Sequence, residues 1–128
     1  MAVPRLMNPV LDADDVRVLA EFYRQLLDLR YRDGDPEDDW ATLLYPDGSR
    51  CLSIQHTDDL QPTTWPEPGV PQQMHLDLSV PSKQVLDEEH ERVTSLGARL
   101  RLDRSDHPQE PLRAYADPAG HIFCLLVG

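Results

Sequence analysis

The chain has 128 residues, of which 40% are apolar and 27% charged, and its formal net charge is −11. This length supports one domain with a core, and the apolar fraction argues against wholesale disorder. The negative charge and the lack of any lysine or arginine run exclude nucleic acid as a main partner. The sequence shows no secretory leader pattern and no apolar run of about 20 residues, so we expect a cytoplasmic protein with no membrane partner.

The first half of the chain predicts one helix among short strands. Apolar residues recur at helical spacing from Val16 to Leu27, which indicates an amphipathic helix capped by Asp14 or Asp15 and ending near Asp28. Strand-like runs are expected at 6–11, 29–32, 40–45 and 51–55. The order is therefore strand, helix and three strands.

The second half repeats this order. A weaker helix is expected from about Ser82 to Leu96, where Gly97 stops it. Strands are expected at 74–80, 99–102, 112–116 and 122–127, and turn sequences at 45–48 and 117–120 precede the last strand of each half. We therefore predict an α+β fold of two βαβββ repeats, 5–57 and 74–128, joined by a proline-rich linker over 58–73 in a single domain, 1–128.

Alternation along the strands predicts which side chains face away from the helices. On the fifth strand, His75 and Asp77 lie opposite Leu76 and Leu78. If each repeat curls its sheet into half of a cup, the cavity wall consists of Asn8, Asp12, Ser53, Gln55, His75, Asp77 and Cys124. Candidate additions are Trp40, Arg113 and Tyr115 from the third and seventh strands and Trp65 as a lid from the linker.

Several segments in order resemble the vicinal oxygen chelate superfamily, which includes glyoxalases, bleomycin resistance proteins and extradiol dioxygenases. They are LAEFY at 19–23 followed by two leucines at 26–27, and DPAGH at 117–121. Trp65-Pro66, QMHLDL at 73–78 and Cys124 are similar to the glyoxalase-like subset common in actinomycete genomes. The resemblance covers nearly the whole chain and implies mixed sheets curved around a cup, but it does not specify a function.

Metal-dependent members of this superfamily hold a divalent ion at four cavity positions, on the first and last strand of each repeat. The resemblance transfers these positions to Asn8, His75, Cys124 and either Ser53 or Gln55. Only His75 is a good ligand, whereas catalytic metal sites usually supply three protein ligands. We therefore expect no intrinsic metal or other cofactor, and if an ion binds, His75 with Gln55 would hold it.

The resemblance then favours a metal-free protein that binds a small molecule, of the bleomycin-resistance or ligand-sequestering type, assembled as a homodimer. The alternative is a lyase or isomerase of the same superfamily, with or without a divalent ion. In that case His75 would act as the base and Asp77 would fix its imidazole tautomer. The sequence leaves open whether the protein is an enzyme.

Each candidate residue also has a structural interpretation. His75 and Asp77 could be a hydrogen-bonded pair that only lines the cup, and Cys124 suits a small buried hydrophobe better than a reactive thiol. Cys51 and Cys124 are expected to be reduced rather than paired. Trp40, Trp65 and Tyr115 could clamp a flat ligand or pack the rims of the sheets. The remaining histidines are expected to be solvated: His56, His90, His107 and His121.

Overall fold

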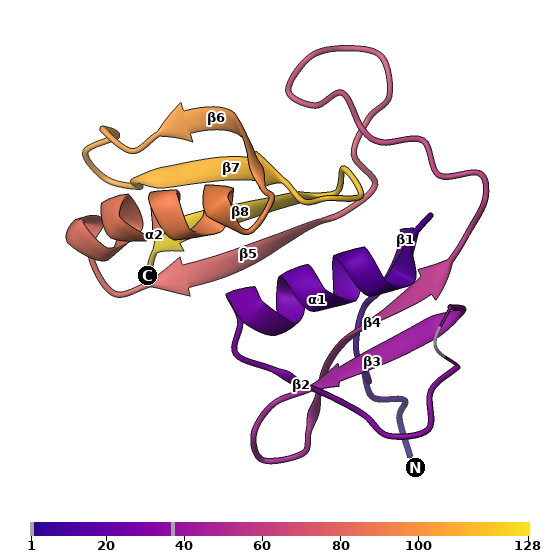
Figure 1. The fold of residues 1–128 in the computed structure, drawn as a ribbon. Helices are drawn as coiled ribbons and strands as arrows, with labels where there is room; N and C mark the ends of the chain where they lie inside the picture. Colours follow the sequence, from indigo (N-terminus) through magenta and orange to yellow (C-terminus); the bar gives the residue numbers. More distant parts are fainter. Residues whose placement is uncertain (1, 37) are drawn as a thin grey trace. The chain divides into compact units, whose positions relative to one another are not determined.

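The structure, a computed structural model, describes residues 2–36 and 38–128. It consists of two units whose boundary lies between Leu60 and Gln61. Each unit holds one four-stranded mixed sheet and one helix (Figure 1), in the order strand, helix, three strands. The predicted α+β fold of two βαβββ modules is confirmed. Because the boundary falls inside the expected linker, most of that linker belongs to the second unit.

The first unit contains β1 (Val10–Ala13), α1 (Val16–Leu26), β2 (Arg30–Tyr31), β3 (Trp40–Leu44) and β4 (Arg50–His56). Its sheet has the order β1-β4-β3-β2, with β1 parallel to β4 and the other neighbours antiparallel. Parallel pairing requires a crossover between the two strands, and the chain between β1 and β4 provides it.

The helix α1 forms where the apolar stripe predicted it. Asp15 is the N-cap, and its carboxylate accepts a hydrogen bond from the Val18 backbone N–H at 3.1 Å. The chain leaves the helix through Asp28, whose φ is +54°. The stripe packs on β3 and β4. Its buried side chains are Val16, Leu19, Ala20, Phe22, Tyr23 and Leu26.

The first strand begins later than the sequence indicated. We predicted it at 6–11, but β1 runs from Val10 to Ala13. Pro9 is the last residue of the missing part, and proline cannot donate a ladder hydrogen bond. The carbonyl of Pro9 still accepts from the Ser53 backbone N–H at 3.0 Å, so pairing with β4 starts at this residue. Asn8 therefore lies just before the strand.

The second unit contains β5 (His75–Val80), α2 (Lys83–Ser95), β6 (Arg99–Arg104), β7 (Leu112–Ala116) and β8 (Ile122–Val127). Its sheet order, β5-β8-β7-β6, repeats that of the first unit. Ser82 caps α2 by accepting from the Val85 N–H at 3.2 Å, and Gly97, with φ +121°, follows its end. The boundaries predicted for this half agree closely with the observed ones.

Both faces of the second sheet are covered, by different parts of the chain. On one face, Leu86 and Val93 of α2 are fully buried, and Tyr115 stacks on Phe123 with 5.4 Å between ring centroids. The other face is a buried cluster of small and branched residues, Ala114, Ala116, Ile122 and Cys124. Trp65 packs against this cluster from the segment before β5.

Among the described residues, no helix combines the length and the apolar character that crossing a membrane requires.

Candidate functional site

The face of the second sheet opposite α2 carries an open cavity of about 200 Å³. Its apolar wall comes from three strands and from the segment before β5, and consists of Trp65, Leu102, Leu112, Ile122 and Leu126. Its polar lining is Gln72, His75, Asp77, Arg104, Glu110 and Cys124. A concave apolar surface with a few convergent polar groups is the usual form of a small-molecule site.

His75 and Asp77 stand side by side at the β5 edge of this cavity. One residue, Leu76, separates them along the strand, so both side chains point to the cavity face. The His75 Nε2 lies 3.2 Å from the Asp77 Oδ1, and the two side chains are 41% and 60% exposed. The carboxylate can therefore orient the imidazole, while solvent or a ligand can still reach both groups.

Cys124 lies on β8 directly opposite Asp77 in the strand register. Burial raises the pKa of its thiol to about 11, and the nearby Asp77 carboxylate adds to the increase. The thiol is therefore protonated at neutral pH and is a poor nucleophile without a further partner. This agrees with its interpretation as a small buried side chain in the cavity floor.

His75, Asp77 and Cys124 also form the group whose donor atoms could hold a metal ion. One nitrogen, one carboxylate oxygen and the thiol sulfur lie within 4.8 Å of one another. Imidazole, carboxylate and thiolate together suit a borderline-soft cation such as Zn²⁺. Binding would require loss of the Cys124 proton. The residues therefore fit an ion with three protein donors, and Asp77 takes a ligand position that the sequence did not assign to it.

Trp65 is held at the cavity by a short closed segment. Arg101 donates from Nη2 to the Thr64 carbonyl at 2.7 Å, and the Thr64 hydroxyl accepts from the Val70 backbone N–H at 2.9 Å. Gly120, with φ +94°, lets the segment approach closely, because a Cβ there would lie 2.5 Å from the Pro62 Cβ. These contacts form a frame behind Trp65, and this frame holds the cavity wall in place.

In the first unit, Asn8, Trp40 and Ser53 come together through Thr42. Asn8 donates to the Ser53 hydroxyl at 2.9 Å, the Ser53 and Thr42 hydroxyls lie 2.8 Å apart, and the Trp40 indole N–H donates to Thr42 at 2.8 Å. Ser53 and Thr42 are both fully buried. The polar groups of these four side chains therefore serve as hydrogen-bond partners for one another. Sequence reasoning missed Thr42, although alternation places it on the same face as Trp40.

Asp12 and Gln55 form a second polar pair in the first unit. The register of β1 and β4 sets them opposite each other, and Gln55 donates from Nε2 to the Asp12 carboxylate at 2.6 Å. The side-chain pair is exposed. Gln55, expected as a metal ligand with His75, is thus engaged with a neighbour in its own sheet.

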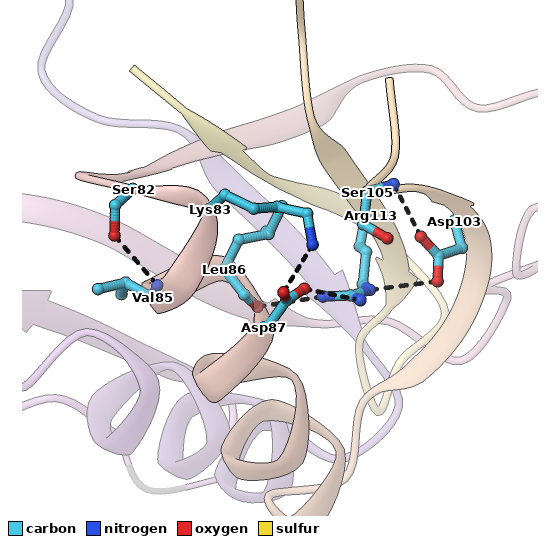
Figure 2. A network of polar contacts seen from close by, with 8 residues as sticks. All are labelled: Ser82, Lys83, Val85, Leu86, Asp87, Asp103, Ser105 and Arg113. Atoms are coloured by element: carbon cyan, nitrogen blue, oxygen red, sulfur yellow. Dashed lines mark hydrogen bonds and ion pairs between the residues drawn. The ribbon is translucent and has the colours of Figure 1, made fainter. Parts of the chain in front are cut away.

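Arg113 and Tyr115 face α2, which corrects the expectation that they line the cavity. Arg113 is paired with Asp103 at 3.3 Å and with Asp87 of α2 at 3.0 Å, and it donates to the Leu86 carbonyl at 3.2 Å. Figure 2 shows this network joining α2 to β6 and β7. The alternate residues of β7, Ala114 and Ala116, occupy the face against Trp65.

His90 is not solvated, in contrast to the sequence-based expectation. Its Nδ1 lies 2.8 Å from the Tyr115 hydroxyl, and the two rings are 5.8 Å apart. Burial raises the pKa of Tyr115 to about 12, so the phenol is neutral at ordinary pH. The pair satisfies a buried hydroxyl between α2 and β7, which is a structural role.

Sequence reasoning missed seven residues of the cavity: Gln72, Leu102, Arg104, Glu110, Leu112, Ile122 and Leu126. Antiparallel pairing with β7 sets Leu102 and Arg104 opposite Ala114 and Leu112 on the cavity face, and choosing the Arg113 and Tyr115 face of β7 concealed this placement. Gln72 and Glu110 precede β5 and β7 in irregular segments, where alternation gives no signal.

A family model described as a glyoxalase-like domain matches residues 8–126. The chain belongs to this glyoxalase-like family, and its structural neighbours lie in the glyoxalase, bleomycin resistance and dioxygenase superfamily. No curated protein matches the sequence.

Solved structures with the same fold share little sequence with this chain. A possible glyoxalase from Bacillus cereus is 16% identical with a TM-score of 0.71, over 97% of this chain and 99% of that one. Fosfomycin resistance protein FosX from Listeria monocytogenes, solved with Mn(II) and sulfate, is 19% identical with a TM-score of 0.72, over 99% and 92%. A glyoxalase/bleomycin resistance protein/dioxygenase family enzyme from Burkholderia phytofirmans is 12% identical with a TM-score of 0.72, over 94% and 96%.

Proposed function

We propose that this glyoxalase-like protein binds a small organic molecule in the cavity of its second unit and acts by sequestering it. The observation that carries the proposal is the cavity of about 200 Å³, in which an apolar wall meets the His75 and Asp77 pair. The apolar wall supplies affinity through burial, and the polar pair supplies orientation. The protonated Cys124 in the floor adds a small polarizable surface rather than a nucleophile.

The second candidate function is a lyase or isomerase of the same superfamily. The cluster of His75, Asp77 and Cys124 favours it, because these donors could hold a divalent ion beside the cavity. Such an ion would supply Lewis-acid polarisation of a substrate oxygen. In this chain Asp77 would orient the His75 imidazole, or both would serve as ligands. The FosX structure with Mn(II) supports the idea only through its fold.

A metal titration separates the two candidates. Protein purified without a metal-affinity tag and treated with chelator is titrated with zinc, manganese, nickel and iron, and its melting temperature is recorded. The sequestering proposal expects no saturable shift. A saturable rise in melting temperature that Asp77→Asn and Cys124→Ser both abolish would favour the metalloenzyme instead. Asp59→Asn, which removes an exposed carboxylate from the first unit, is the matched control and should leave the melting-temperature shifts unchanged.

A ligand screen then tests the binding proposal directly. Fragments are added to isotope-labelled protein, and chemical shifts of the Trp65 indole and of the His75 and Cys124 amides are followed. Ligands of this cavity should move all three signals, and Trp65→Ala should weaken their binding. If His75→Ala abolished turnover of a substrate while leaving its affinity unchanged, the protein would be an enzyme and the sequestering proposal would be wrong.

Homodimer assembly and a cytoplasmic location, both expected from the sequence, stay predictions. Light scattering across a dilution series measures the first, and cell fractionation measures the second.

A further inference from the structure

The cavity of the second unit has a negatively charged side chain at one end and a positively charged one at the other. The order of the strands in the sheet places them there. The order β5-β8-β7-β6 sets Asp77 at one edge and Arg104 at the other. The strand register shows that Asp77, Arg104 and the residues between them lie on the same face of the sheet. Asp77 is opposite Cys124, Cys124 opposite Ala114, and Leu112 opposite Arg104. Three strand spacings, about 14 Å in total, separate the two edges.

The β5 end of the cavity can accept hydrogen bonds and attracts positively charged groups. The Asp77 side chain is 60% exposed, so its carboxylate remains accessible from the cavity although it also contacts the His75 imidazole and the Cys124 thiol. A carboxylate in this position favours an ammonium or another charged N–H donor.

The β6 end offers a guanidinium. Within 2–36 and 38–128, no hydrogen bond or ion pair engages the Arg104 side chain, and the residue is exposed at the cavity edge. Glu110 lines the same cavity and lowers the net positive charge at this end. Recognition by Arg104 must therefore come from its directed, two-pronged donors, which match a carboxylate or a phosphonate.

The rest of the cavity lining is mostly apolar, apart from Cys124 and Gln72, whose side-chain oxygen is buried and has no hydrogen-bond partner among the described residues. Ile122 and Leu126 of β8 form the floor, and Trp65 forms a wall above the same face. A hydrocarbon or aromatic ring fits here, since polar atoms would lose hydration without gaining partners.

We propose that the ligand is a zwitterionic amphiphile, with an ammonium at Asp77, an apolar middle on Trp65 and Ile122, and an acidic group at Arg104. This rests on the proposed binding function and adds the chemical class of the ligand. Both side chains line the cavity, so the charged groups of the ligand need to span less than the distance between the two edge strands.

Four probes test this class: 4-(aminomethyl)phenylacetate carries both charges, 4-methylphenylacetate and 4-methylbenzylamine carry one each, and p-xylene carries none. Dissociation constants are measured from the Trp65 indole and His75 amide shifts of the full chain. The doubly charged probe should bind about fivefold more tightly than either singly charged one, which is the usual worth of a partly screened ion pair.

Charge-removing variants assign each end. Asp77→Asn should weaken both amine-containing probes and leave 4-methylphenylacetate unchanged, whereas Arg104→Gln should weaken both acids only. Glu110→Gln should strengthen binding of the acids. The matched controls are Asp59→Asn and Arg50→Gln, which remove the same charges from the first unit and should alter no dissociation constant.

Different outcomes would contradict the assignment of a zwitterionic ligand and the binding function itself. If all four probes bind with equal strength, or if the variants act without regard to probe charge, the cavity binds ligands but the assignment of a zwitterion is wrong. If p-xylene binds and none of the charged probes does, the assignment is also overturned while the binding function stands. If no probe, p-xylene included, moves the Trp65 or His75 signals, the proposed function itself is wrong.

Discussion

Asp28 and Gly97 follow the two helices with the same sign of φ, +54° for Asp28 and +121° for Gly97. The two modules therefore leave their helices through a left-handed residue, but only the second uses the residue type that adopts this conformation without strain. The aspartate also places a negative charge at the negative end of the α1 dipole.

Replacing Asp28 by glycine should therefore stabilise the protein. We expect Asp28→Gly to raise the free energy of unfolding by about 0.5–1 kcal/mol, with Asp28→Asn in between. Urea denaturation measures this change. Gly97→Ala is the converse test and should destabilise by about 1 kcal/mol through φ alone, since a Cβ there would meet Pro118 only at an ordinary 3.5 Å. If Asp28→Gly were less stable than the parent, the carboxylate would have a role that the helix end does not explain.

Removing the Ser53 hydroxyl should lower the free energy of unfolding, because two polar groups then lose a hydrogen-bond partner. Ser53→Ala deprives the Asn8 amide and the buried Thr42 hydroxyl of a partner. Loss of a buried hydrogen-bond partner costs about 1–3 kcal/mol, and denaturant unfolding should show a decrease of this size. Ser49→Ala is the matched control on an exposed turn and should cost less. A double-mutant cycle with Thr42→Val should reveal coupling, and additive effects would contradict the network.

Asp103 should contribute stability that depends on acid pH. Hydrogen bonds from Ser105 and, to a smaller extent, from Arg113 lower the pKa of Asp103 to about 2. The folded pKa is thus below the unfolded value of about 3.9. The contribution is present above the unfolded pKa and is lost as the pH falls through the folded pKa.

The urea midpoint of Asp103→Asn should therefore fall less than that of the parent between about pH 4 and pH 2. Asp59→Asn is the control and should follow the parent curve. Glu21, whose pKa is lowered to about 2 mainly by its hydrogen bond with Arg24, titrates in the same range and remains in both proteins. Parallel curves for the parent and Asp103→Asn would show that the Ser105 and Arg113 contacts do not form in solution.

The two thiols should react with Ellman's reagent at different rates. Cys51 is half-buried, whereas Cys124 is buried and has a pKa raised to about 11. At pH 7.5 the first thiol to react should be Cys51, and Cys124 should react only after denaturation. Cys51→Ser should remove the fast phase. A fast phase that persisted in Cys51→Ser would show that Cys124 is ionised or accessible in the folded protein.

The sequence predicted the fold well because each helix and strand carried a local signal. The α1 stripe, the caps Asp15 and Ser82, and the alternation of His75 and Asp77 with leucines all depend on nearest neighbours along the chain. Cys124 was placed correctly on the cavity face for the same reason. These signals do not need knowledge of tertiary contacts.

The site was predicted less well where one strand has no clear polar and apolar faces. The β7 sequence alternates alanine with Arg113 and Tyr115, and a prediction that favours large polar side chains for a cavity chooses the wrong face. The alanines face the cavity side because Trp65, distant in sequence, fills that space. His90 was wrongly predicted to be solvated for a similar reason, since its partner Tyr115 is 25 residues away.

The frame behind Trp65 combines main-chain oxygens with the hydroxyls of Thr63 and Thr64, which accept from the Trp65 and Val70 N–H groups. Arg101 binds the carbonyl of Thr64, and the Thr64 N–H donates to the Val70 carbonyl at 3.0 Å. Neither bond uses the side chain at position 65. Because these bonds do not involve the side chain at position 65, a different residue there would leave them in place. The side chain that forms this wall can therefore be replaced, and a single substitution at position 65 can change ligand preference while the hydrogen bonds of the surrounding segment stay the same.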